Sequence, residues 1–278
     1  MSPEELVLIA ASVLLIGSAD VFGGFASRTS APLAVTAWSQ AAGIPVVIIA
    51  AVAVGGELIG RDLALGFAAG FGSALGVAAL YRGFSVSSVG IVAPVAATTA
   101  AAVPIVVGFI SGERPSTMVA IGILVAILAI FAVSYVPGQN VHALVAVGHG
   151  VASGLGFGFM VFAYAATSSD SGLWSLVVGR TTASVVPAIA LIVLGVSWKI
   201  ARSARLATAL AGVLASLGLA AFVAASQTTD LILLGVALGL FPTTTVILAA
   251  VFLKDKLVWS QWFGIAGATV AVALISIG

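Results

Sequence analysis

Two short charged stretches, VFLKDKLVW at residues 251–259 and FISGERPST at residues 109–117, interrupt long apolar runs of the chain. The stretches lie 142 residues apart, so that Glu113 in one corresponds to Asp255 in the other. Acidic and basic side chains between two apolar runs are typical of turns at a membrane surface, where they cap helix ends and contact lipid headgroups. The stretches therefore predict the same kind of turn in two related halves of the chain.

The composition of the chain favours a membrane over water as its surroundings. Of the 278 residues, 62% are hydrophobic and 7% are charged, whereas soluble domains have about 45–50% apolar and about 25% charged residues. A soluble fold needs polar residues on its outside, but a protein in a bilayer does not. The chain has no cysteine, which excludes disulfides and thiolate metal sites. A net charge of +1 predicts no nucleic-acid partner, and no pattern indicates a cofactor.

Apolar segments of about 20 residues, the length that crosses a bilayer as a helix, follow one another along the chain. They are solidly apolar rather than alternating with a period of two, which predicts helices rather than a β-barrel. We therefore expect an all-α membrane protein with ten transmembrane helices. The expected spans are residues 6–27, 33–55, 63–81, 88–110, 117–136, 142–166, 173–196, 206–225, 231–252 and 258–277.

The second half of the chain repeats the first with a shift of 142 residues. Without gaps, the shift superposes Pro45 on Pro187, Gly70 on Gly212, Gly76 on Gly218, Ala79 on Ala221, Ile105 on Ile247, Glu113 on Asp255, Gly122 on Gly264 and Ser134 on Ser276. We expect two five-helix repeats, residues 1–136 and residues 137–278. Because five is an odd number, the second repeat would enter the membrane from the opposite side. Inverted repeats are typical of transporters, whose halves enclose a central cavity near the midplane and rock around it.

Basic loop residues predict the orientation of the chain, because cytoplasmic loops carry an excess of lysine and arginine. On the side of the N-terminus lie Arg61 and Arg114. On the other side lie Arg28, Arg82, Lys199, Arg202, Arg205, Lys254 and Lys256. This distribution predicts that both termini lie outside the cell.

Several segments resemble one family of transporters. The third expected span ends in AALYRGFS, and the fourth, VGIVAPVAATTAAAVPIVVGF, contains prolines and leads into the acidic turn SGERPS. A fifth span led by glycine follows, and the series recurs as AAFVAASQ, LGLFPTTTVILAAVFLKDKL and FGIAGATVAVALIS. The chain resembles the drug/metabolite transporter superfamily, of the ten-helix type with two EamA-like repeats. Within that superfamily it is most similar to bacterial aromatic amino acid exporters of the YddG type.

This resemblance implies a basket-like bundle around a central cavity. The first, third, fourth, sixth, eighth and ninth helices would surround the cavity, and the fifth and tenth would pack toward the outside. It also implies export of amino acids across the cell inner membrane. In contrast to the loop charges, it places both termini in the cytoplasm. A monomer suffices, because both repeats lie in one chain.

Two charged residues lie deep in expected spans. Asp20 lies roughly eight residues, or about 12 Å, from the end of its helix. An ionisable residue at that depth predicts a function, either proton coupling or a buried structural hydrogen bond. Arg180 lies about seven residues into its span and aligns with Trp38 of the first half. Its guanidinium group can bind a substrate carboxylate through two parallel hydrogen bonds, pair with Asp20, or extend to an interface.

Aromatic residues are further candidates for the substrate site. Tyr81 combines a ring with a hydroxyl group, which suits neutral or zwitterionic solutes, but its place near a loop fits an interfacial residue equally well. Trp38 and Tyr164 lie deeper and are additional candidates for the cavity lining. Tryptophans next to loops are expected to anchor at the membrane surface, namely Trp174, Trp198, Trp259 and Trp262.

Prolines in the fourth and ninth spans predict kinks that matter for gating. Pro94, Pro104 and Pro242 each lack a backbone N–H, and the carbonyl groups left free can face a cavity. Hydroxyl groups beside these prolines are expected to line that cavity, namely those of Thr98, Thr99, Thr243, Thr244 and Thr245. The alternative is that these hydroxyl groups bond back to carbonyl groups of their own helix.

Glycines recur at four-residue spacing in GFAAGFGSALG, residues 66–76, and in HGVASGLGFGF, residues 149–159. Small residues at this spacing favour close packing of neighbouring membrane helices. We expect His149, within the second stretch, to be structural, because a single histidine does not make a metal site.

Together, these features predict a transporter that exports small organic solutes, aromatic and apolar amino acids among them, by alternating access. The alternative is proton-coupled efflux of drugs or lipophilic cations, for which Asp20 is the one deep carboxylate in the expected spans. An intramembrane enzyme would need a Ser/His pair, paired aspartates or a metal cluster, and the sequence has neither an HExxH nor a GxSxG motif. A channel would need a ring of like charges or a filter loop. The expected partners are therefore a small-molecule substrate and the lipid bilayer.

Overall fold

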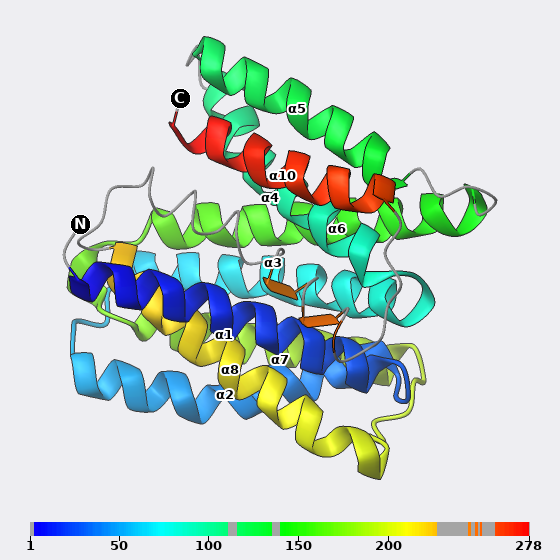
Figure 1. The fold of residues 1–278 in the computed structure, drawn as a ribbon. Helices are drawn as coiled ribbons and strands as arrows, with labels where there is room; N and C mark the ends of the chain where they lie inside the picture. The colour runs from blue at the N-terminus through cyan, green and yellow to red at the C-terminus, as the bar shows by residue number, and fades with distance from the viewer. Residues whose placement is uncertain are drawn as a thin grey trace.

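The computed structural model describes residues 3–110, 116–134, 140–226, 244–245, 248–249, 251 and 259–277. These residues form a bundle of helices that lie side by side (Figure 1). The long helices are α1 (Pro3–Ser27), α2 (Pro32–Val54), α3 (Gly60–Val86), α4 (Val89–Ile110), α5 (Thr117–Ser134), α6 (Asn140–Ala165), α7 (Trp174–Val193), α8 (Arg205–Ser226) and α10 (Trp259–Ile277). Two short 3-10 helices, η1 (Ser169–Ser171) and η2 (Arg202–Ala204), precede α7 and α8.

The expected spans agree with these helices, because long apolar runs between polar breaks determine both. The largest difference is at the end of the third span, expected at residue 81, where α3 continues to Val86. Most of the ninth expected span, residues 231–252, lies outside the described residues, as do the two charged stretches around Glu113 and Asp255.

Six helices in the described part of the chain are long and apolar enough to cross a membrane. Their membrane segments are Ala10–Ser27, Pro32–Val54, Gly60–Val86, Ala143–Tyr164, Trp174–Val193 and Arg202–Ala225. Val89–Ala100 in α4 and Trp262–Ala271 in α10 are shorter apolar segments. The expectation of an all-helical, multi-pass membrane protein is confirmed for the described residues. The number of ten spans and their inverted arrangement stay predictions.

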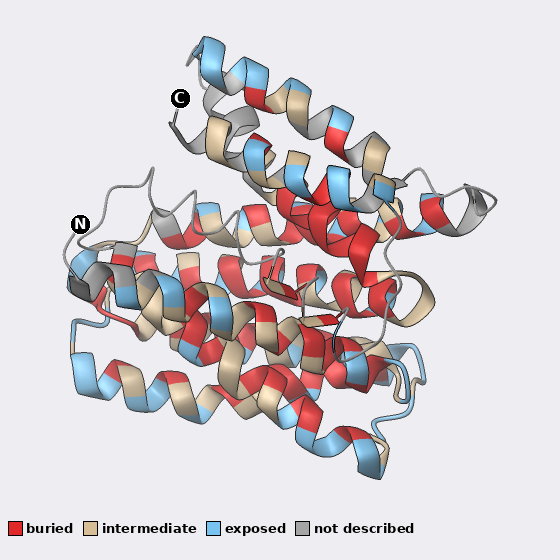
Figure 2. Cartoon of the chain, viewed as in Figure 1, coloured by how far each residue is buried: buried red, intermediate tan, exposed pale blue. Residues whose placement is uncertain are grey.

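Large apolar side chains cover the outer faces of the bundle. Exposed residues follow α2 and α5, which lie at opposite edges (Figure 2). On α2, Ile49 and Val52 are 69% and 65% exposed. Apolar groups on the outside are favourable in lipid, whereas each backbone polar group must be satisfied inside its helix.

Each inner helix packs on helices that are distant in sequence. Helix α3 packs on α6 and α7, α8 packs on α1 and α2, α2 packs on α7, α4 packs on α6, and α5 packs on α10. Glycine makes the closest of these contacts possible. A Cβ on Gly70 of α3 would overlap with the Gly179 carbonyl oxygen of α7, and a Cβ on Gly212 of α8 would overlap with the Ser39 carbonyl oxygen of α2.

The glycines of α6 divide between two neighbouring helices. A Cβ on Gly150, Gly154 or Gly158 would meet α4, whereas a Cβ on Gly156 would lie 2.6 Å from the backbone nitrogen of Gly76 in α3. Helix α6 therefore lies between α3 and α4, and the packing role predicted for the stretch at residues 149–159 is confirmed.

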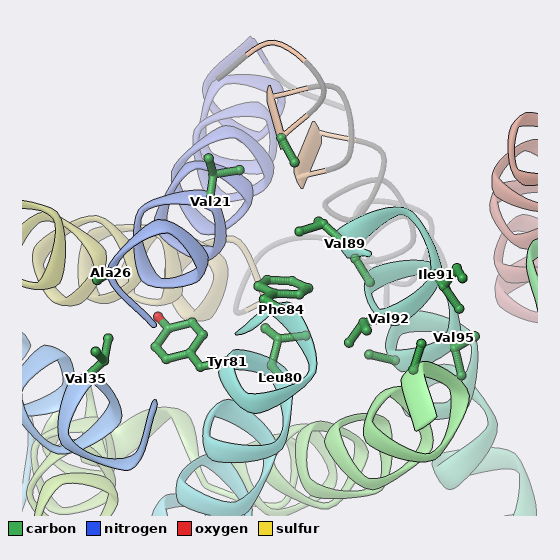
Figure 3. Close-up of a cluster of buried hydrophobic side chains, with 14 of the residues drawn as sticks. Val21, Ala26, Val35, Leu80, Tyr81, Phe84, Val89, Ile91, Val92 and Val95 are labelled. Atoms are coloured by element: carbon green, nitrogen blue, oxygen red, sulfur yellow. The ribbon is translucent and has the colours of Figure 1, made fainter. Parts of the chain in front are cut away.

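An apolar core fills the space between α3, α4 and α1. It is centred on Leu80 and Phe84 of α3, with Val89, Val92 and Val95 of α4 packed beside them (Figure 3). Tyr81 belongs to the same cluster, and its ring points from α3 toward α1 and α2 (Figure 3). The core thus holds Tyr81 away from the loop that follows α3.

Candidate functional site

A chain of three buried polar side chains connects α2, α3 and α7. Gln40 on α2, Ser73 on α3 and Arg180 on α7 are 1%, 8% and 6% exposed. Arg180 Nη1 donates a hydrogen bond to Gln40 Oε1, and Gln40 Nε2 donates one to Ser73 Oγ at 3.1 Å. Arg180 Nε is buried and has no hydrogen-bond partner within the described ranges. A cation deep in the bundle is thus held by a neutral amide.

Helical periodicity brings Gln40 and Arg180 to the interior. Gln40 follows Ala37 and precedes Gly43 on the buried face of α2. Arg180 follows Leu176 and precedes Ala183 on the buried face of α7. Residues three or four positions apart share one face of a helix, so both polar side chains lie on otherwise apolar or small-residue faces.

Two buried tyrosines flank Arg180. A Cβ on Gly179, the residue before Arg180, would overlap with the Tyr164 hydroxyl group, and a Cβ on Gly23 of α1 would overlap with the Tyr81 hydroxyl group. Ser39 of α2 lies next to the Tyr81 hydroxyl group. Both tyrosines lie close enough to Arg180 to interact with its charge. The structure thus brings together three of the predicted site residues, Tyr81, Tyr164 and Arg180.

Asp20 lies on α1 at a different place from Arg180. Its Oδ2 accepts a hydrogen bond from Thr245 Oγ1 at 3.3 Å, and Tyr81 lies near it. Among the described residues, Arg180 is bonded to Gln40 and is not paired with Asp20. Tyr81 therefore lies within electrostatic range of both the buried carboxylate and the buried guanidinium.

The threonines of α4 bond to their own helix. Thr98 Oγ1 donates to the Pro94 carbonyl oxygen at 2.9 Å, and Thr99 Oγ1 donates to the Val95 carbonyl oxygen at 2.8 Å. For these hydroxyl groups the sequence left two possibilities, lining a cavity or bonding back to their own helix, and the structure shows the bonds to their own helix. Pro94 and Pro104 lie within α4, and Thr244 is helical and partly buried. Pro242 and Thr243 lie outside the described residues.

Trp38 does not join the polar chain, although it immediately precedes Ser39 and Gln40. Its side chain is 49% exposed, and its indole N–H donates to the Trp198 carbonyl oxygen at 3.1 Å. An aromatic ring that reaches from a helix to a loop is typical of residues at a membrane interface. Trp198 and Trp259 are also exposed, as expected for anchoring residues.

Sequence reasoning missed Gln40 and Ser73, which are the partners that hold Arg180. One signal was present: Gln40 is an uncharged polar residue about as far into its span as Arg180 is into its own. The repeat alignment pointed instead to Trp38, two positions earlier. Two residues correspond to about 200° around a helix, so Trp38 points outward where Gln40 points inward.

Comparison with known proteins found one family model and one solved structure that resemble the chain. No curated protein matches the sequence. A crystal structure of another protein has a TM-score of 0.64 over 100% of this chain and 98% of that chain, at 13% identity, and therefore shows a shared fold alone. The model of the EamA-like transporter family matches residues 4–135. Residues 4–135 are therefore similar to the EamA-like transporter family.

Proposed function

We propose that the chain is a membrane transporter that exports small organic solutes, amino acids among them, by alternating access. It would consist of two inverted repeats, residues 1–136 and residues 137–278, around a central cavity. The EamA-like match ends at residue 135, which agrees with the first of these boundaries. Amino-acid substrates, export and the cell inner membrane follow from the resemblance to aromatic amino acid exporters.

The packing of the helices carries this proposal. A shift of 142 residues relates α1 to α6, α2 to α7, α3 to α8 and α5 to α10. If each helix is replaced by its equivalent in the other half, the α3–α6 contact becomes the α8–α1 contact, and both contacts are present. In the same way the α3–α7 contact becomes the α8–α2 contact, and both of these are present too. The α2–α7 and α5–α10 contacts each join two equivalent helices, so the exchange leaves them unchanged. Such exchange is what a two-fold axis between the repeats would produce.

One pair of glycine contacts supports the same relation at the level of single residues. A Cβ on Gly76 of α3 would lie 2.8 Å from the ring of Phe157 in α6, and a Cβ on Gly218 of α8 would lie 3.1 Å from Leu15 in α1. Gly218 follows Gly76 by 142 positions, and Phe157 follows Leu15 by 142 positions. Both contacts therefore occur at equivalent positions of the two proposed repeats.

Arg180 favours an amino acid over a lipophilic cation as the substrate. It is a buried positive charge whose hydrogen-bond partner is the neutral Gln40. Such a charge attracts a carboxylate and repels a cation. Efflux of cations would instead rely on Asp20, which hydrogen-bonds with Thr245. We keep Asp20 as the coupling residue, because its bond to Thr245 connects the two proposed repeats.

Around Arg180 we propose a lining that includes Tyr81 and Tyr164. Hydroxyl groups that donate to their own helix still accept hydrogen bonds, which suits the ammonium group of an amino acid. The hydroxyl groups proposed for this role belong to Thr98, Thr99, Thr243 and Thr244. Pro94, Pro104 and Pro242 would permit bending of the helices that carry them. Trp38 is left out of the site, because its indole N–H is bonded to the Trp198 carbonyl group.

Counterflow in proteoliposomes tests the proposal directly. Vesicles containing the purified protein are loaded with one of a panel of amino acids and drug cations, and uptake of the labelled compound is followed. We expect saturable exchange of amino acids that contain apolar or aromatic side chains. Exchange confined to the cations would favour multidrug efflux, and exchange of neither class would contradict transport of small organic solutes.

A further inference from the structure

We propose that Gln40 is the positioning residue that holds Arg180 ready for a substrate carboxylate without neutralising its charge. The inference rests on the transport function proposed above and assigns a role to a residue that no motif identifies. Three observations carry it: the hydrogen bond from Arg180 to Gln40, the hydrogen bond from Gln40 to Ser73, and the buried Nε of Arg180, which has no partner among the described residues.

The two hydrogen bonds determine the orientation of the Gln40 amide. A guanidinium group has donors and no acceptor, so the group of Gln40 that faces Arg180 is the carbonyl oxygen Oε1. The amide nitrogen Nε2 then points to Ser73 Oγ, 3.1 Å away. Because Ser73 lies on α3 and Arg180 on α7, the amide connects three helices and fixes one rotamer of the guanidinium group.

The neutrality of Gln40 keeps the charge of Arg180 available. A carboxylate at position 40 would form a buried ion pair with Arg180 and compete with any carboxylate on a ligand. In the ranges that the structure describes, the one hydrogen-bond partner of Arg180 is Gln40. Gln40 can therefore orient the guanidinium group while leaving its net positive charge to attract an anion.

One edge of the Arg180 guanidinium group is not used by Gln40. Nη1 is bonded to Gln40, whereas Nε has no partner in the described part of the chain and is buried. Nε and Nη2 form one of the two forks with which arginine binds the two oxygens of a carboxylate in parallel. A buried donor without an acceptor is costly, and a bound carboxylate removes that cost. The expected ligand is a small organic carboxylate.

Two substitutions at position 40 separate orientation from charge. Gln40→Glu retains an acceptor for Arg180 but adds a negative charge. Gln40→Met introduces a side chain of similar size that has neither the amide hydrogen bonds nor a charge. Ser153→Ala is the matched control, because Ser153 on α6 is fully buried, and its hydroxyl group has no partner in the described residues. Full-length protein in detergent is titrated with three carboxylate and amide pairs: phenylalanine and phenylalaninamide, leucine and leucinamide, and benzoate and benzamide.

The readout is the selectivity ratio, which is the apparent affinity for a carboxylate divided by that for its amide, measured from ligand-dependent thermal stabilisation. Because hydrogen bonds to charged groups are stronger than those between neutral groups, we expect a wild-type ratio of about 10 to 100 for at least one pair. In Gln40→Glu the ratio should fall to about 1, and in Gln40→Met it should fall by about tenfold. Ser153→Ala should retain the wild-type ratio. A purely structural role of Gln40 would lower the unfolding temperature without changing the ratio.

Binding and transport are scored separately, so that the two proposals fail in different ways. A wild-type protein that binds no carboxylate in preference to its amide overturns the inference, whatever it transports. A Gln40→Glu variant that is folded and keeps the wild-type ratio overturns it too. If the wild-type protein prefers carboxylates to their amides and the Gln40→Glu variant does not, the inference stands. It stands even if counterflow is absent and the proposed function fails.

Discussion

The two ends of the bundle are closed by different chemistry. At one end, the segments between α1 and α2 and between α7 and α8 meet (right in Figure 1), and Arg28, Lys199, Arg202 and Arg205 are exposed there. At the other end, the segments between α2 and α3 and between α6 and α7 meet (left in Figure 1), with Glu57 and Asp170 exposed. The first is here named the basic end and the second the acidic end.

Two hydrogen bonds between neutral groups connect the segments at the basic end. The Ala201 N–H donates to Ser30 Oγ at 3.0 Å, and the Trp38 indole N–H donates to the Trp198 carbonyl oxygen at 3.1 Å. Each bond joins a segment of the first proposed repeat to one of the second. Bonds between neutral groups are individually weak, and both of these bonds are of that kind.

A buried carboxylate holds the acidic end. Asp62, in the first turn of α3, is 1% exposed and accepts hydrogen bonds from the Ser168 N–H at 3.1 Å and the Ser168 hydroxyl at 2.5 Å. The Glu57 N–H also donates to the Asp170 carbonyl oxygen at 2.8 Å. The hydrogen bonds that connect the two repeats therefore differ in strength between the basic end and the acidic end. Alternating access would have to open both ends in turn. The comparison teaches that related helix packing does not require related loop chemistry.

The largest effect is expected from a glycine at the acidic end. Gly172 has a φ of +54°, and a Cβ there would overlap with the Gly55 carbonyl oxygen. Gly195 near the basic end has a φ of +62°, and no atom of the described residues lies within 4 Å of its Cβ position. Gly172→Ala should lower the free energy of unfolding by about 3 kcal/mol, since steric overlap adds to backbone strain. Gly195→Ala, the matched control, should lower it by about 1 kcal/mol.

Denaturant titration of both glycine variants in detergent measures this difference. Equal losses of stability would mean that the contact between Gly172 and Gly55 does not hold the acidic end.

A smaller loss is expected from Asp62→Ala. Removing the carboxylate leaves the two Ser168 donors without their acceptor, which should lower the free energy of unfolding by about 1.5–3 kcal/mol. Ser30→Ala at the basic end removes one neutral acceptor and should lower it by about 0.5–1.5 kcal/mol. The same titration checks both values. A larger loss in Ser30→Ala than in Asp62→Ala would reverse the ranking of the two ends.

The smallest effect is expected from Trp38→Phe at the basic end. The ring is kept and one neutral hydrogen bond to the Trp198 carbonyl group is lost, at a partly exposed position, so that the stability loss should be about 0.5 kcal/mol. Counterflow of amino acids should be unchanged, because Trp38 lies outside the proposed site. A loss of transport in a folded Trp38→Phe variant would place this residue in the substrate path after all.

The helices could be predicted from the sequence, whereas the partners of the deep charges could not. Apolar length sets where a membrane helix begins and ends, and this information is local. The partners of Arg180 depend on which faces of α2, α3 and α7 meet, and that is decided by glycine contacts such as Gly70 with Gly179. Thr98 shows the same limit, because its hydroxyl group could bond to its own helix or face a cavity, and sequence alone does not distinguish these.

Single-cysteine labelling tests the central claim, that the two repeats cross the membrane in opposite directions. The chain has no cysteine of its own, so Arg28→Cys and Asp170→Cys, at exposed positions 142 residues apart, can be labelled one at a time with a membrane-impermeant maleimide. Inverted repeats predict that the two positions react from opposite faces, with Lys199→Cys reacting on the face of Arg28→Cys and Glu57→Cys on that of Asp170→Cys. Labelling of Arg28→Cys and Asp170→Cys from the same face would contradict the inversion.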